Sequence, residues 1–373
     1  MLYVDMPTLP ELHTLATTRA PICASLFLPT TPLSQEAEAD RITLKNLTQQ
    51  VVGELHAKEF DKGEVGALEE HLTDLVDDES FWRYQARSLA VLATPNSVRS
   101  YRLPNQLIEH AEVSDRFHLK PLLRAVTFPH HAFVLVLSQN EVRLVELYSD
   151  MPAATLHVPD LPKDAASAVR RPSIRSRSPH GRLQGSEGQK VLLRQYARQI
   201  DHALRAYIAG RHTPLLLAAV EPLDAIFREV NSYPHLVASS LEGITERSSD
   251  GDLERAAREA LDHRYANEIE VLKATFDLRV GQGRTTVDVS DAARAATIGT
   301  IEALIVDMDQ VMPGLVDETD GRVSFRDVPG ADSYDVLDEI ACRSLLKGAR
   351  VLSARQGDIP HGGPLAAILR YAV

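Results

Sequence analysis

The chain has 373 residues, of which 44% are hydrophobic and 25% are charged. This length allows two or three domains with separate cores, and this composition is that of an ordinary soluble globular protein rather than a fibrous or disordered one. The net charge of −12 excludes a protein whose whole surface binds nucleic acid.

No targeting or membrane segment is expected. The first residues lack the basic and apolar regions of a signal peptide, and no stretch approaches the roughly 18 to 20 apolar residues of a membrane helix. The two cysteines, Cys23 and Cys342, are too few for a disulfide framework. We therefore expect a protein of the reducing cytoplasm.

The positive charge is concentrated in one segment. Residues 170–211 contain ten Lys or Arg and two acids, a net charge of +8, so the rest of the chain carries −20. Such a segment indicates either a local site for anions such as RNA phosphates or a solvated loop that happens to be basic. Both interpretations are open at this point.

Residues 1–126 are predicted to form a first α/β domain. Apolar residues at helical spacing predict helices over 34–60 and 64–76. Two apolar runs, at 89–93 and 98–103, flank a turn signal and predict a pair of strands.

Residues 127–285 are predicted to form a middle domain. The continuous apolar run at 132–137 is typical of a strand covered on both faces, and the chain returns over 142–148. A basic loop follows at 170–190. The elements after the loop are a helix over 190–209, a strand over 215–220, a helix from Pro222 and a long helix over 253–278.

Residues 286–373 are predicted to form a third α/β domain. The expected elements are helices over 291–298 and 334–346 and strands over 301–306, 350–354 and 366–371. The fold class is therefore α/β, with three α/β domains in sequence.

The helix over 190–209 is predicted to be amphipathic. At 100° per residue, Arg194, Arg198 and Arg205 fall on one side, and Tyr196 and Ile200 fall on the opposite side. One face of this helix is thus basic and the other apolar.

Several familiar active sites are absent from the sequence. It contains no Gly-rich phosphate or dinucleotide loop and no nucleophile elbow. It also lacks His-Glu-x-x-His and paired Cys-x-x-Cys motifs, so neither a metal site nor a cofactor is predicted. Adjacent His130 and His131 point to opposite faces of a strand, so they and His361 are predicted to be surface or hydrogen-bonded residues rather than ligands.

One loop carries possible chemistry. Residues 185–189 read Gly-Ser-Glu-Gly-Gln, just before the basic helix. Glycine lets the backbone approach a substrate closely, and Gln189 at a loop tip offers a donor and an acceptor. The alternative is a solvated linker whose glycines confer only flexibility.

The end of the chain carries a family resemblance. Residues 362–371 read Gly-Gly-Pro-Leu-Ala-Ala-Ile-Leu-Arg-Tyr, which resembles the last domain of class I release factors of archaea and eukaryotes and of Pelota. Glu187-Gly188-Gln189 stands where release factors have a Gly-Gly-Gln loop before a basic helix. Residues 88–103, 115–122 and 231–234 resemble the bacterial branch of this superfamily.

The resemblance implies an RNase H-like middle domain and a C-terminal α/β sandwich. It also implies a ribosome-associated release or rescue factor whose partners are the ribosome and tRNA or rRNA, with no role for DNA or a membrane. Gly188 and Gln189 would position water against the peptidyl-tRNA ester. RNA binding would fall to nine basic residues, namely Arg170, Arg171, Arg175, Arg177, Arg182, Lys190, Arg194, Arg198 and Arg205.

Two departures from the family pattern leave alternatives open. Glu187 replaces the first glycine of the loop motif, and the first domain has no equivalent of the codon-reading Asn-Ile-Lys-Ser motif. The chain therefore either promotes hydrolysis on the ribosome or binds there without it. The other alternative is a protein-interaction scaffold that retains the release-factor-like fold.

Overall fold

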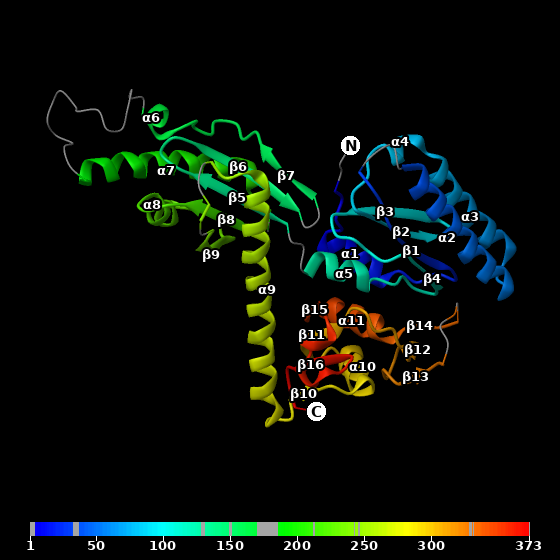
Figure 1. The fold of residues 1–373 in the computed structure, drawn as a ribbon. Coiled ribbons are helices and arrows are strands. Elements are labelled where there is room, and N and C mark those ends of the chain that lie inside the picture. Colours follow the sequence, from blue (N-terminus) through cyan, green and yellow to red (C-terminus); the bar gives the residue numbers. More distant parts are fainter. Residues whose placement is uncertain are drawn as a thin grey trace. The chain divides into compact units, whose positions relative to one another are not determined.

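The structure is a computed structural model, and it describes residues 4–32, 37–127, 131–148, 151–169, 186–211, 213–241, 243–244, 247–327, 330 and 332–372. They form a mixed α/β fold with several sheets, as predicted (Figure 1). The chain divides into two compact units: unit 1 comprises residues 1–129 and 267–373, and unit 2 comprises residues 130–266. None of the helices within the described ranges combines the length and apolar character needed to cross a bilayer.

The N-terminal part of unit 1 is built on an antiparallel sheet with strand order β3-β2-β1-β4. Its strands are β1 (Cys23–Pro29), β2 (Ser88–Thr94), β3 (Ser97–Leu103) and β4 (His110–Ser114). Its helices are α1 (Leu9–Thr17), α2 (Ala37–Ala57), α3 (Lys62–Asp77), α4 (Glu79–Trp82) and α5 (Lys120–Thr127).

Both faces of this sheet are covered because its central strands alternate between two cores. Leu26 and Leu28 of β1 pack with the apolar stripes of α2 and α3 on one face. Cys23 and Phe27 of the same strand point to the other face, where α1 and α5 supply the apolar partners. The period of two along a strand explains this division.

The C-terminal part of unit 1 contains a second sheet with strand order β10-β16-β11-β15 and a small sheet with order β13-β12-β14. Its strands are β10 (Thr285–Thr286), β11 (Ile301–Asp307), β12 (Pro313–Val316), β13 (Val323–Phe325), β14 (Tyr334–Asp335), β15 (Arg350–Ala354) and β16 (Leu365–Leu369). Its helical elements are α10 (Val289–Ile298), α11 (Val336–Leu346) and the short turns η1 (Gln356–Asp358) and η2 (Pro360–Gly362).

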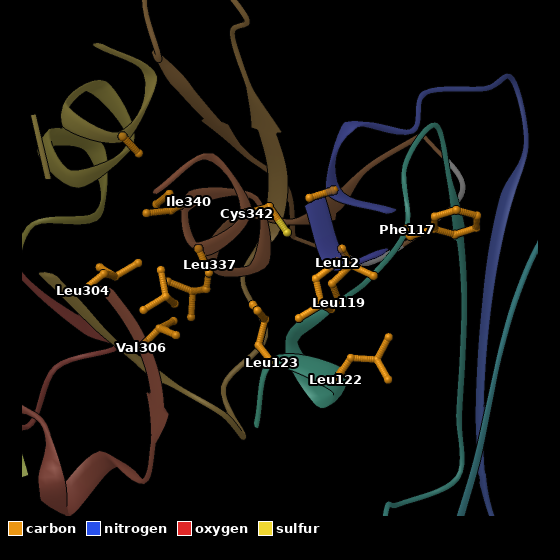
Figure 2. Close-up of a cluster of buried hydrophobic side chains, with 14 of the residues drawn as sticks. Leu12, Phe117, Leu119, Leu122, Leu123, Leu304, Val306, Leu337, Ile340 and Cys342 are labelled. Carbon is orange, nitrogen blue, oxygen red and sulfur yellow. The ribbon is translucent and has the colours of Figure 1, made fainter. Parts of the chain in front are cut away.

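One hydrophobic cluster joins the two parts of unit 1 (Figure 2). Leu119 and Leu123, from the segment that leads into and forms α5, belong to the same buried cluster as Leu337 and Ile340 of α11. Leu304 of β11 completes this contact from the second sheet. The first 129 residues and the last hundred therefore share a core.

Unit 2 is built on a five-stranded sheet with order β7-β6-β5-β8-β9. Its strands are β5 (Ala132–Leu137), β6 (Val142–Tyr148), β7 (Met151–Leu156), β8 (Leu215–Ala219) and β9 (Leu236–Ser240). The pairs β5–β6 and β6–β7 are antiparallel, whereas β8 runs parallel to both β5 and β9.

Helices cover both faces of the unit 2 sheet. One face packs against α6 (Ala165–Ala168), α7 (Ser186–Ile208) and α8 (Leu223–Val230). The other face packs against the first part of α9 (Asp250–Val280), through Leu253, Ala257 and Leu261. Later residues of α9, Leu272 and Phe276, belong to a core of unit 1.

Most of the elements predicted from the sequence are present. The strands β5 and β6 have the predicted bounds, and the C-terminal sheet contains the three strands expected for it. Its last strand ends at Leu369, earlier than the predicted residue 371. The three-domain division and the RNase H-like character of the middle domain stay predictions.

Candidate nucleic-acid interface

The buried face of α7 anchors the helix in unit 2. Tyr196 and Ile200 are fully buried in the core beneath the helix. The Tyr196 hydroxyl donates a hydrogen bond to the carbonyl oxygen of Ser138 at 3.1 Å, and burial raises the pKa of this tyrosine. The prediction that these two side chains lie behind the basic face is confirmed.

The opposite face of α7 carries the predicted basic residues. Lys190, Arg198 and Arg205 are exposed, and Arg194 is half-buried. Residues four apart on a helix lie on the same face, so Lys190, Arg194 and Arg198 form a continuous stripe. Arg205 extends it by two further turns. We call these four residues the basic stripe.

Two acids offset part of this charge. Arg194 Nη2 lies 2.7 Å from Glu229 Oε2 of α8, and Arg205 Nη2 lies 3.0 Å from Asp201 Oδ2. Arg198 forms no ion pair with any other residue that the structure describes. Because exposed ion pairs contribute only about 0 to 1 kcal/mol, Glu229 can be displaced by a competing phosphate at small cost.

The segment 231–234, which carries part of the resemblance, has a structural role next to the stripe. The buried carboxylate of Asp201 accepts hydrogen bonds from the backbone N–H of Ser232 at 2.7 Å and from its hydroxyl. The Tyr233 hydroxyl donates to the carbonyl of Thr213 at 2.6 Å. These contacts tie the end of α7 to the chain entering β8 and β9.

Gly188 and Gln189 do not lie at a loop tip, so this prediction is wrong. α7 begins at Ser186, four residues earlier than expected, and both residues belong to its first turn. Gly188 is buried and Gln189 is half-buried. A helical glycine costs only about 1 kcal/mol relative to alanine, which the buried face of a 23-residue helix outweighs.

The remaining predicted site residues cannot be placed. Arg170, Arg171, Arg175, Arg177 and Arg182 lie outside the described residues, as does most of the predicted basic loop. The structure therefore brings together the four basic residues of α7, Lys190, Arg194, Arg198 and Arg205.

Two of the three histidines considered as possible metal ligands, His131 and His361, lie among the described residues. The imidazole of His131 stacks on the Tyr148 ring at 4.2 Å, and its Nε2 lies 2.9 Å from Glu146 Oε1. The ring of His361 contacts that of Phe276 edge-on at 5.8 Å. His131 is thus hydrogen-bonded, as predicted, whereas His130 lies outside the described residues.

The segment 115–122, which also carries the resemblance, supplies buried cations to unit 1. Lys120 Nζ lies 2.6 Å from Asp335 Oδ2, and Arg116 Nη1 lies 2.7 Å from Glu339 Oε1. Burial opposes the charge of Arg116, but Asp115 and Glu339 outweigh this effect and raise its pKa. The segment thereby joins the N-terminal part of unit 1 to α11.

One group of side chains with metal-binding chemistry was not predicted from the sequence. His110, Glu112 and His118 approach one another beside β4 in unit 1. The sequence did contain an indication of this group. His110 and Glu112 are two residues apart, and residues with this spacing on a strand lie on the same face. Neither His-Glu-x-x-His nor paired Cys-x-x-Cys motifs have this spacing.

The comparisons with known proteins give one family match. Residues 129–267 match the model of a family described as bacterial archaeo-eukaryotic release factor family 11. The matched segment contains the whole of unit 2, including α7. This match confirms the resemblance to bacterial relatives of the release factors. No curated protein matches the sequence.

Solved structures of translation factors are also similar to the chain at low identity. The archaeal translation termination factor aRF1 is 14% identical over 98% of this chain and 99% of its own, with a TM-score of 0.25. Pelota from Archaeoglobus fulgidus is 11% identical over 99% and 94%, with a TM-score of 0.30. A ribosome-bound archaeal Pelota is 12% identical over 77% and 78%, with a TM-score of 0.42.

Proposed function

We propose, from the match of residues 129–267 to the bacterial release factor family, that this chain is a ribosome-associated factor that binds RNA through the basic stripe of α7 and the arginines that precede it. One observation carries the RNA-binding part of this proposal. The buried Tyr196 and Ile200 hold α7 in a fixed rotation, so the stripe faces outward from unit 2 without any rearrangement.

The length of the stripe suits a nucleic-acid backbone. Lys190 and Arg205 are fifteen residues apart, which corresponds to about 22 Å along a helix. Phosphates along one strand of a duplex are about 3.4 Å apart along its axis, so a stripe of this length can reach several of them. The net charge of +8 over residues 170–211 supports the same proposal.

Phosphate contacts fix position without reading sequence. The stripe consists of Lys and Arg side chains and lacks an aromatic platform among its four members. We therefore propose recognition of rRNA or tRNA backbone, and a cytoplasmic site of action follows from the ribosomal partner. Contacts to the phosphate backbone alone do not read the bases of a codon.

We propose binding without self-contained catalysis as the first version of this function. A Gln189 side chain that positions water against a peptidyl-tRNA ester must project from the protein, yet it is half-buried in the first turn of α7. Hydrolysis by Gly188 and Gln189 would therefore require the Gln189 side chain to become more exposed on the ribosome. Under either version the arginine contacts supply the affinity.

Sedimentation of the protein with purified ribosomes at two salt concentrations tests the proposal. Binding that weakens steeply with salt is expected, because each phosphate contact releases counterions. Protein that stays in the supernatant at low salt contradicts ribosome binding. That outcome favours the alternative, a protein-interaction scaffold with a predominantly acidic surface.

A further inference from the structure

Three side chains with metal-binding chemistry meet at the edge of the N-terminal sheet in unit 1. His110 Nε2 and His118 Nδ1 each lie 3.5 Å from Glu112 Oε2. One donor atom from each of the three residues lies within 4.8 Å of the other two. None of the three belongs to unit 2 or to the proposed RNA-binding surface.

Strand pairing and packing within unit 1 position these side chains. On the edge strand β4, His110 pairs with Phe27 and Glu112 pairs with Ser25 of the neighbouring strand β1. The backbone N–H of His118 donates to the Ser25 hydroxyl at 2.9 Å. The Phe27 ring contacts the His118 imidazole edge-on, with centroids 6.1 Å apart. The donors are therefore preorganised by the sheet.

The buried imidazole of His118 has an unused nitrogen. The His118 side chain is only 4% exposed, and its Nδ1 has no hydrogen-bond partner among the described residues. Its second acidic neighbour, Asp338 Oδ2, lies 4.0 Å away, and both oxygens of that carboxylate accept from the Leu119 N–H. A buried polar atom without a hydrogen-bond partner lowers the free energy of unfolding by about 1 to 3 kcal/mol. The unpartnered Nδ1 therefore indicates that a ligand binds here.

We propose that His110, Glu112 and His118 bind a divalent transition-metal ion of the zinc class. Two imidazole nitrogens and one carboxylate oxygen are a donor set of zinc sites that leave a fourth position for water or another ligand. Zinc–ligand bonds of about 2.0 to 2.1 Å at tetrahedral angles separate neighbouring donors by about 3.3 Å. The two distances of 3.5 Å to Glu112 are close to this value.

The surroundings agree with a cation at this position. The carboxyl group of Asp338 lies 4.0 Å from the same Nδ1 of His118, so a second acidic side chain stands close to the proposed cation. The His110 side chain is 42% exposed, which gives an ion access from solvent.

This site departs from the prediction that the chain holds no metal. The donors come from a strand and from the loop after it, and the fold rather than a local motif assembles them. Mg²⁺ and Ca²⁺ prefer oxygen ligands, whereas imidazole favours Zn²⁺, Cu²⁺, Fe²⁺ and Ni²⁺. The site should therefore bind a transition-metal ion in preference to Mg²⁺ or Ca²⁺.

Calorimetric titration of Zn²⁺ into the full-length, untagged, chelator-treated protein tests the proposal. We expect one Zn²⁺ per chain, undiminished by a large excess of Mg²⁺. His110→Ala and Glu112→Gln remove one ligand each, and we expect each to weaken binding by more than the about 10- to 100-fold typical of outer-shell changes. His56→Ala is the matched control, because it removes an exposed imidazole from α2 and is expected to leave the affinity unchanged.

His118→Ala is less suitable as a first test because His118 is buried, so circular dichroism must show that this variant folds. Absorption of bound Co²⁺ gives a second readout, since loss of a histidine nitrogen alters the visible bands. A wild-type protein that binds no stoichiometric Zn²⁺ overturns the proposal. So does unchanged Zn²⁺ affinity in both His110→Ala and Glu112→Gln.

Discussion

Lys120 Nζ and Asp335 Oδ2 form an ion pair of 2.6 Å in which the two side chains are 2% and 0% exposed. Lys120 is the first residue of α5, and Asp335 caps the first turn of α11 by accepting the Leu337 N–H. Lys120 also donates to the carbonyl of Gln310. A buried charge pair of this kind specifies which surfaces meet, because neither partner can be left unpaired in the core.

We expect Lys120→Met to destabilise unit 1 by about 3 to 5 kcal/mol, because Asp335 is left as an uncompensated buried charge. Asp335→Asn should destabilise unit 1 by a similar amount, because it leaves the buried ammonium group of Lys120 without its acidic partner. Urea denaturation followed by circular dichroism measures both. The double variant should lose less than the sum of the two single variants. Additive losses, or single losses below about 1 kcal/mol, would show that the pair is not coupled.

Features that depend on contacts between residues close in the sequence could be predicted, whereas features that depend on contacts between distant residues could not. The bounds of β5 and β6 were predictable because an apolar run and its turn are local features. Glu339, the buried partner of Arg116, and Asp335, the buried partner of Lys120, each lie more than 200 residues away in the chain. The local sequence therefore does not show that these two cations are buried. The first turn of α7 was missed for the opposite reason, because Gly188 locally disfavours a helix that tertiary packing stabilises.

Gly321 offers a test of backbone strain in the β12–β13 connection. Its φ is +72°, and an added Cβ would lie 2.7 Å from the Arg294 Cα and 2.8 Å from the Ala293 carbonyl oxygen. Gly321→Ala therefore combines the left-handed penalty of about 1 to 2 kcal/mol with a clash against α10 backbone. Gly348→Ala is the control, because it has a φ of +74° and nothing within 4 Å. Equal losses of stability in the two variants would contradict the close packing at Gly321.

The carboxyl of Glu146 should make unit 2 sensitive to acid. Burial opposes its ionisation, but hydrogen bonds from His131 and Tyr148 and the charge of Arg211 outweigh burial, so its pKa is lowered from 4.5. A lowered folded-state pKa contributes stability that is present above pH 4.5 and is lost as the pH falls through the folded value. Glu146→Gln should therefore lower stability at pH 7 and flatten the loss of stability below pH 4.5, measured by urea titrations across pH.

The control for this prediction is Glu259→Gln, which removes an exposed carboxylate from α9 in the same unit. It should retain the wild-type pH profile. If stability depends on pH in Glu146→Gln as it does in the wild type, other carboxyl groups are responsible for the loss of stability at low pH.

Glu229 is expected to restrain the basic stripe. It lies 2.7 Å from Arg194 Nη2, and its own side chain is 60% exposed. Glu229→Gln releases the arginine and removes a repulsive charge, so it should tighten ribosome binding, by up to about fivefold if the pair contributes the 0.2 to 1 kcal/mol typical of exposed pairs. Quantitative co-sedimentation at low salt measures the change. Glu259→Gln changes the net charge equally and should have little effect, so an equal gain there would indicate a general charge effect.

The basic stripe itself separates the proposed function from its alternative. Arg194→Ala combined with Arg198→Ala removes two candidate phosphate contacts from adjacent turns of α7. Each contact contributes about 0.7 to 0.9 to the slope of log affinity against log salt, so the double variant should bind ribosomes more weakly and with a slope flatter by roughly one to two units. Tyr196 and Ile200 are buried behind the stripe, so the substitutions should leave stability nearly unchanged.

Gln189→Ala distinguishes binding from hydrolysis. A single neutral side chain adds little to a phosphate-dominated interface, so ribosome binding should be retained. Release of peptide from ribosome-bound peptidyl-tRNA then gives the decisive readout. Release by the wild type that Gln189→Ala abolishes would establish the hydrolytic version. With no release by the wild type and intact ribosome binding, the factor acts by occupying the ribosome, which is what a half-buried Gln189 in a helical turn favours.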